Sequence, residues 1–427
     1  MGLRTAQTPQ PDQRKFFGWW ISIAALFTSG LTVGIPYYNI PFFYDYFQRA
    51  FGWSRASITF GFPLAALLTI WAGPLLIHRF SPRKLILVGS TLIAIALGGF
   101  GSMGSSLSIY YALWFVYTAG YILSGPIPHQ LIVSHWFRRN RGKALSIVYV
   151  GNGLIGSFGS LLVKPLTDDF GFRTALRIVA ALLLLCWPVA LFVLRDKPSE
   201  LGQYPDGDPS PPAEARLQSH SFAELLRSGP FWLILFGSFC SIGAIGAVNF
   251  HMKFVFLDEG FAAGSIVDAA WRTASVLILW SSVAGRLIIG GLADSFSKKI
   301  VMTATFILVA ATIPILLLVR PGHPTTLYTF AVLFGLGLGA DYMLIPLIAA
   351  DQFGINSLAR AMAVILPVNT IGQTWFPYFV SILRDRSAGY SIALGAVLVV
   401  AIAGAISIAV LPSRSTTLQP WQEKLSA

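Results

Sequence analysis

Arg286 is the first residue whose type and position point to chemistry. It lies in SSVAGRLIIGGLAD (281–294), directly after the apolar stretch ASVLILW. A guanidinium inside an apolar helix costs about 2.5–3.5 kcal/mol on insertion scales, so such a charge indicates a function. Its planar fork suits a carboxylate. The sequence therefore predicts an organic-anion site at Arg286, with Ser282 one turn earlier on the same face. The alternative is an interhelical ion pair that fixes packing.

Asp341 is a candidate for carrying a proton. It lies ten residues before Asp351, whereas Arg286 lies eight residues before Asp294. At about 1.5 Å per helical residue, Asp341 and Arg286 lie at similar depth. We expect the two to form an ion pair, either a permanent structural one or one that is broken when an anion binds.

His251 is a second candidate for proton coupling, because histidine titrates near neutral pH. It lies in NFHMKFVFLDEG, and its alternative role is that of a hydrogen-bonded structural residue. Lys253 in the same stretch is expected to extend its side chain towards Asp258 and Glu259.

Six more polar side chains in apolar segments are candidates for contact with a substrate. Several are spaced four residues apart and so share a helix face. Each is either a ligand contact or a polar group that packs helices together. They are Tyr117, Tyr121, Asn152, Tyr342, Asn369 and Gln373.

The composition is that of a membrane protein. Hydrophobic residues make up 55% of the 427 residues and charged residues 11%, whereas soluble domains carry about 25% charged residues. The net charge of +12 comes from short loops between apolar runs, which favours a role in topology over nucleic-acid binding. The histidines and cysteines have no metal-ligand spacing, and no phosphate-binding glycine loop is present. We expect no cofactor, and a carrier that is not driven by ATP.

Twelve apolar runs are long enough to cross a bilayer as helices, which takes about 20 residues each. They predict an all-α membrane protein with two six-helix bundles. The runs are 16–38, 57–77, 85–104, 109–133, 143–166, 174–194, 231–257, 266–293, 300–320, 325–350, 359–383 and 388–411.

A polar stretch rich in proline and glycine, 195–229, divides the helices six and six and is typical of a flexible linker. The predicted organisation is an N-terminal tail (1–15), a first bundle (16–194), the linker, a second bundle (230–411) and a C-terminal tail (412–427). Lysine and arginine are more numerous in the loops on the side of the termini, which predicts that both termini and the linker are cytoplasmic. We expect a multi-pass protein of the plasma (inner) membrane that acts as a monomer.

The two halves repeat a short loop pattern. HRFSPRK (78–84) follows the second span, and DSFSKK (294–299) follows the eighth. The segment GGLADSFSKK (290–299) resembles the signature of the major facilitator superfamily. This resemblance implies a gating loop that contains Asp294 in the second half and Arg83 and Lys84 in the first. The first half departs from the pattern, because His78 and Ser81 replace its acid and its glycine.

Three further stretches resemble the monocarboxylate and oxalate–formate transporter branch of that superfamily. They are FGWSR (51–55), WFRRNRGKALSIVYVGNGLIG (136–156) and GRLIIGGLAD (285–294). The resemblance implies that Arg286 binds the substrate carboxylate and that Tyr342 lines the site. It also implies a second cation on the eleventh helix in dicarboxylate exchangers, whereas residues 361–383 contain no lysine or arginine.

The sequence as a whole predicts a secondary transporter for small organic monocarboxylates, driven by protons through alternating access. Its partners are then the organic anion, protons and the lipid bilayer. The alternatives are an organic-anion antiporter of the oxalate–formate type, a proton-driven drug exporter, and a receptor on the same fold that binds without transport.

Overall fold

The computed structural model describes residues 16–69, 80–209, 222–387 and 389–412, and these form helices and turns without a strand. Nine of the described helical segments are long and apolar enough to cross a membrane. One of them, Arg141–Phe192, contains two of the predicted spans, because the chain kinks at Gly171 (φ 77°). Helices α4 (Arg55–Thr69) and α16 (Ile355–Ser387) take the places of the second and eleventh spans. The predicted all-helical fold is confirmed.

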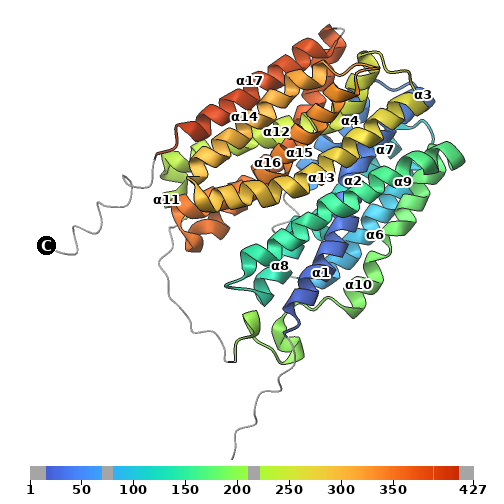
Figure 1. Cartoon of the computed structure of the whole chain (residues 1–427). Helices are drawn as coiled ribbons and strands as arrows, with labels where there is room; N and C mark the ends of the chain where they lie inside the picture. The colour runs from blue at the N-terminus through green and yellow to red at the C-terminus, as the bar shows by residue number, and fades with distance from the viewer. Residues whose placement is uncertain (1–15, 70–79, 210–221, 388, 413–427) are drawn as a thin grey trace, which may run out of the picture.

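The first half of the chain forms one group of helices (Figure 1). Besides α4, its elements are α1 (Gly18–Ser29), the π-helix η1 (Gly30–Gly34), α2 (Ile35–Asn39), the 3-10 helix η2 (Ile40–Phe43), α3 (Tyr44–Phe51), α6 (Pro82–Phe100), α7 (Leu107–Ser124), α8 (Pro126–Trp136), α9 (Arg141–Leu183) and α10 (Cys186–Phe192).

The second half forms the other group. Besides α16, its elements are α12 (Gly229–Asp258), α13 (Ser265–Ser295), α14 (Lys298–Leu317), α15 (Pro324–Phe353) and α17 (Tyr390–Ala409). Between the two groups lie η3 (Pro198–Leu201), η4 (Pro205–Gly207) and α11 (Phe222–Arg227). The halves pack against each other mainly through α9 with α13 and α4 with α16.

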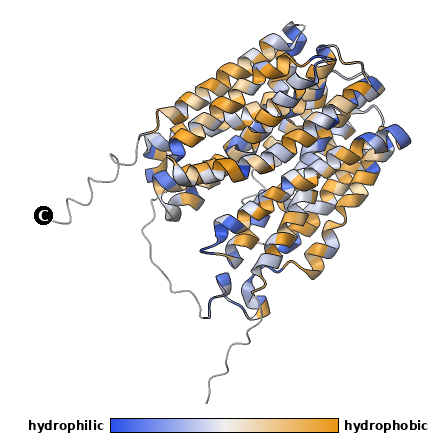
Figure 2. Cartoon of the chain, in the orientation of Figure 1, coloured by the Kyte–Doolittle hydropathy of each residue, from blue (hydrophilic) through white to orange (hydrophobic). Residues whose placement is uncertain are grey.

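The two ends of the molecule differ in what they contain. Figure 1 shows α3 at one end, here called the distal end, and α8, α10 and α11 at the other, here called the linker end. Hydrophilic residues collect at both ends, and the helices between them are predominantly hydrophobic (Figure 2). This distribution is the one that a bilayer around the middle of the molecule requires.

The first helix is longer than the sequence pattern predicted. The expected span ended at residue 38, but helical structure continues through η2 and α3 to Phe51. Gly52 then ends the helix in the left-handed region (φ 70°), which favours glycine. The extension places Asp45 inside the protein, where it is 2% exposed.

Candidate functional site

Glycines bring α13 and α15 close enough for Arg286 to contact the backbone of α15. A Cβ at Gly339 would lie 1.9 Å from the carbonyl oxygen of Ser282, and one at Gly285 would lie 2.4 Å from that of Leu336. No larger residue fits at such a close helix crossing. The Arg286 Nε donates to the carbonyl of Gly339 at 3.3 Å.

Arg286 also reaches the other half of the molecule. Its Nη1 donates to the carbonyl of Tyr149 on α9, and the guanidinium interacts electrostatically with the phenols of Tyr38 and Tyr149. The side chain is 9% exposed. Among the described residues, no carboxylate forms an ion pair with it. Arg286 is therefore a buried cation between the halves, and its partners among the described residues are all uncharged.

Asp341 does not pair with Arg286, so the expected ion pair is wrong for this structure. Asp341 is fully buried, and its Oδ2 accepts from the hydroxyl of Ser241 on α12 at 2.6 Å. Its Oδ1 has no hydrogen-bond partner among the described residues. The reason is helical phase: Arg286 contacts the backbone of Gly339, and Asp341 lies two residues further, about 200° around the helix. The similar depth of the two residues did not decide which way each one faces.

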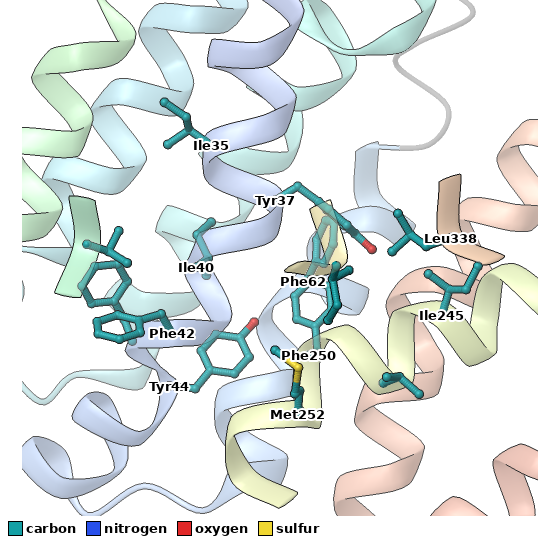
Figure 3. Close-up of a cluster of buried hydrophobic side chains, with 14 of the residues drawn as sticks. Ile35, Tyr37, Ile40, Phe42, Tyr44, Phe62, Ile245, Phe250, Met252 and Leu338 are labelled. Carbon is teal, nitrogen blue, oxygen red and sulfur yellow. The ribbon is translucent and has the colours of Figure 1, made fainter. Parts of the chain in front are cut away.

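Gln373 joins the two halves near the middle of the protein. Its Nε2 donates to the hydroxyl of Tyr37 on α2 at 2.7 Å and to that of Tyr342 on α15 at 2.5 Å. Figure 3 shows Tyr37 extending from the first half towards Leu338 of the second. The structure thus brings the predicted residues Gln373 and Tyr342 together, and adds Tyr37, which sequence reasoning missed.

Four tyrosines within the apolar helical segments keep partial exposure. They are Tyr38, Tyr121, Tyr149 and Tyr342. Tyr121 interacts electrostatically with Tyr38 and Tyr149, and Tyr342 with Tyr38 and Tyr121, so they lie around a common central region with Arg286. Tyr117 is buried and stacks on Tyr121, with ring centroids 6.3 Å apart. Tyr38 and Tyr149 were missed, although YY at 37–38 within an apolar span was a signal.

Three predicted contacts face neighbouring helices. Asn152 Oδ1 accepts from the hydroxyl of Ser29 at 2.8 Å, and Asn369 Oδ1 accepts from that of Ser238 at 2.9 Å. Each bond joins helices of one half, at matching places in the internal repeat. Ser282 is fully buried and donates to the carbonyl of Leu279 in its own helix. In this structure these side chains are held by the protein itself.

His251 is fully buried with both ring nitrogens bonded. Its Nε2 donates to the carbonyl of Pro377, and its Nδ1 is hydrogen-bonded to the hydroxyl of Tyr390, both at 2.7 Å. A carbonyl only accepts hydrogen bonds, so Nε2 is the donor there, and the Tyr390 hydroxyl satisfies the other ring nitrogen. The geometry matches the structural alternative stated above.

Lys253 does not extend towards Asp258 and Glu259, so that expectation is wrong. Its Nζ lies 2.6 Å from Asp45 Oδ1 and 2.7 Å from Asp268 Oδ1, and all three side chains are at most 2% exposed. Asp45 belongs to the first half and the other two to the second. Lys253 thereby links α3 to α12 and α13 at the distal end, and we call these three residues the distal triad.

The distal triad has a neighbour that also crosses between the halves. Arg55 of α4 pairs with Asp258 of α12 at 2.7 Å, and Asp258 pairs with Arg384 of α16 at 2.8 Å. Next to them, the hydroxyl groups of Thr59 and Ser381 are 2.7 Å apart. All ion pairs between the halves that the described residues form lie at the distal end.

The predicted gating loop is engaged within its own half. Arg83 Nε donates to the carbonyl of Ala190 at 2.7 Å, and its backbone N–H donates to Asp196 at 2.9 Å. The backbone N–H of Lys84 donates to the hydroxyl of Ser81, which caps α6. The side chain of Asp294 lies outside the described residues.

The first part of the linker contacts the first half of the protein. Asp206 accepts hydrogen bonds from the backbone N–H groups of Arg138 and Arg139, both at 2.8 Å, and of Asn140 at 3.3 Å. Partial burial alone would raise the pKa of Asp206, but these bonds hold it below its usual value. The composition of the linker, from which flexibility was predicted, does not reveal such specific contacts. Residues 210–221 lie outside the described part.

Comparison with known proteins identifies the family. Residues 25–281 match the model of the Major Facilitator Superfamily. The chain is 25% identical over 405 residues to monocarboxylate transporter 11 of Mus musculus, covering 90% of this chain and 85% of that protein. It is 29% identical over 342 residues to the probable nitrate/nitrite transporter NarK2 of Mycobacterium tuberculosis, covering 76% and 80%. A bacterial homologue of the human lysosomal transporter Spinster shares the fold, with a TM-score of 0.62 at 16% identity over 93% of this chain and 94% of that one.

Proposed function

Because the chain belongs to the Major Facilitator Superfamily, we propose that it moves small organic monocarboxylates, such as lactate or pyruvate, together with a proton by alternating access. Its relatives are membrane transporters and not enzymes. The observation that carries the proposal is Arg286, a buried cation between the halves without a carboxylate partner among the described residues.

The chemistry of Arg286 favours a planar oxyanion. A guanidinium offers N–H donors in a fork that matches the two oxygens of a carboxylate. The phenol of Tyr38 lies near the guanidinium, and those of Tyr121 and Tyr342 lie near Tyr38. Together they supply uncharged hydrogen-bonding groups in this region. A cationic drug would be repelled by Arg286. A dicarboxylate would lack a second cation in the membrane-spanning part of α16, since residues 361–383 contain no lysine or arginine.

Asp341 is the group that we assign to the proton. It is fully buried, it has no cation partner among the described residues, and it adjoins Tyr342. An ionised carboxylate in such a place is costly, and a bound proton removes the charge. With Arg286 positive, the substrate negative and Asp341 neutral, the loaded protein would carry no net charge from these three groups through the bilayer.

The position of the ion pairs between the two halves supports alternating access. The distal triad and the Arg55–Asp258 pair would have to separate for the distal end to open. In the orientation that the loop charges favour, the linker and both termini are cytoplasmic, the membrane is the plasma membrane, and the distal end faces outward.

Uptake into proteoliposomes tests the substrate site. A panel of labelled monocarboxylates with and without an inward proton gradient should show proton-stimulated uptake. Arg286→Lys should lose most of it, because an ammonium keeps the charge but not the fork. Arg177→Lys is the matched control, since Arg177 is exposed and bonds to Ser102. Full uptake by the folded Arg286→Lys variant would contradict the proposed role of Arg286.

The proton assignment has its own test. Asp341→Asn mimics the neutral acid, so it should still exchange substrate across the membrane but fail to accumulate it under a proton gradient. Asp351→Asn, at the linker end beside Lys298, should do both. Proton-driven accumulation by Asp341→Asn would show that another group carries the proton, and His251 would be tested next.

Nitrate or nitrite is a second candidate substrate. The similarity to a probable nitrate/nitrite transporter favours it, and nitrate presents the same planar pair of oxygens to a guanidinium. Uptake of labelled nitrate without uptake of any carboxylate would select this alternative while leaving the role of Arg286 in place.

A further inference from the structure

A groove of about 670 Å³ lies where the two halves meet on the side of the helices. It is lined by Leu161 of α9, by Arg272, Thr273, Val276 and Leu277 of α13, and by Tyr328 and Val332 of α15. Its walls thus come from both halves. Leu161, Tyr328 and Val332 are exposed, at 43%, 48% and 39%.

The lining changes from polar to apolar along the helices. Arg272 and Tyr328 lie one turn nearer the distal end than Val276 and Val332, respectively. Helix α13 has 31 residues and is about 46 Å long, so about 8 Å extends beyond each side of a 30 Å hydrocarbon core. Arg272 is about 10 Å from the start of the helix, which places it at the boundary between headgroups and hydrocarbon. Tyrosine is typical of the same level.

Arg272 has no acidic partner among the described residues. Asp268 precedes it by one helical turn, but its carboxylate is bound to Lys253 and to the hydroxyl of Tyr46 inside the protein. By contrast, Arg55 and Arg320 at the same end pair with Asp258 and Glu259. The groove therefore presents an uncompensated cation and a phenol above an apolar channel.

We propose that this groove binds a phospholipid from the leaflet at the distal end. The phosphate lies against Arg272 and the Tyr328 hydroxyl, and one acyl chain follows Val276, Leu277 and Val332. The phosphate of a lipid supplies the anion that Arg272 lacks. The acyl chain continues from the headgroup just as the apolar part of the groove continues from Arg272 and Tyr328. Because α9 forms one wall and α13 and α15 the other, the lipid contacts both halves.

Native mass spectrometry of the purified, delipidated full chain tests the proposal. Phosphatidylglycerol is titrated in, and the fraction of protein carrying one lipid is measured. Arg272→Gln should bind about tenfold more weakly, since it removes a charge-assisted contact to phosphate. Val276→Trp should weaken binding similarly by filling the channel while leaving Arg272 in place. Arg386→Gln is the control, because Arg386 is exposed at the same end and does not line the groove.

The thermal unfolding midpoint of each variant without lipid shows whether it is folded. Wild-type affinity in Arg272→Gln or in Val276→Trp would overturn the proposal, and so would an equal loss in Arg386→Gln, which would indicate unspecific attraction to positive charge. The measurement does not involve transport, so it is independent of the proposed substrate.

Discussion

Replacement of Lys253 by methionine should release the distal end of the molecule. The Lys253 Nζ lies 2.6 Å from Asp45 and 2.7 Å from Asp268, and the side chains are 2%, 2% and 0% exposed. Methionine keeps the length of the side chain but leaves two carboxylates buried without this cation. Breaking a buried ion pair in this way costs about 3–5 kcal/mol. Arg49 still pairs with Asp45 at 2.7 Å, so the lower value applies.

The lost free energy weakens the contact between the halves, because Asp45 lies in the first half and Lys253 in the second. A cost of about 3 kcal/mol corresponds to a roughly hundredfold larger open population. The assay is the rate at which a thiol reagent labels Ser381→Cys, a position that is fully buried in this structure. Cys186→Ala and Cys240→Ala provide a background without other thiols. Labelling should be about a hundredfold faster after Lys253→Met, because its rate follows the open population.

A matched control and a rescue make the test specific. Lys298→Met removes a lysine that pairs with Asp351 at 3.5 Å and is 33% exposed at the linker end, so labelling should not change. Adding Asp268→Asn to Lys253→Met removes the carboxylate left without a cation, and should restore slow labelling in large part. Labelling of Lys253→Met within twofold of the background, or a double variant no slower than Lys253→Met, would refute this account of the distal triad.

Three further predictions follow from the same structure. A disulfide between Thr59→Cys and Ser381→Cys, whose native hydroxyl groups are 2.7 Å apart, should stop transport until a reductant is added; unchanged flux in the fully oxidised protein would show that the distal end need not open. Gly339→Ala should lower the yield of folded protein, since its Cβ would lie 1.9 Å from a backbone oxygen. Gly395→Ala is the control: it has open space around it, so it should raise the free energy of unfolding in chemical denaturation by about 0.5–1 kcal/mol. Backbone hydrogen bonds lower the pKa of Asp206. Their stabilising effect is therefore present above the usual carboxyl pKa of about 3.9 and is lost as the pH falls through the lowered pKa. The difference in thermal midpoint between wild type and Asp206→Asn should shrink at low pH.

The helices were predictable because the bilayer imposes them on the sequence. Every backbone polar group in the hydrocarbon has to be bonded within the protein, so a long apolar run is a helix. The first helix shows the limit of this argument: the expected span ended at residue 38, yet helical structure continues to Phe51. Asp45 in this extension is buried against Lys253 of the second half, a contact that hydropathy along one segment does not contain.

The distal triad could not be predicted because its members come from distant segments. The acids that lie closest to Lys253 along the sequence are Asp258 and Glu259. The lysine nevertheless pairs with Asp45 and Asp268. Asp258 and Glu259 are occupied by arginines instead. Which cation meets which acid depends on how the halves pack.

Arg286 and Asp341 differ from the other buried charges in a way that bears on function. Lys253 and Arg55 are neutralised by acids at the distal end, where their ion pairs hold the halves together. Arg286 and Asp341 lie on neighbouring helices, but the helical phase of α15 turns Asp341 towards Ser241 and leaves Arg286 with backbone carbonyls. If the two were paired, the protein would already balance its own charges, and an anion would have to break that pair. Under the proposed function, an anion bound at Arg286 and a proton bound at Asp341 would each remove a separate electrostatic cost.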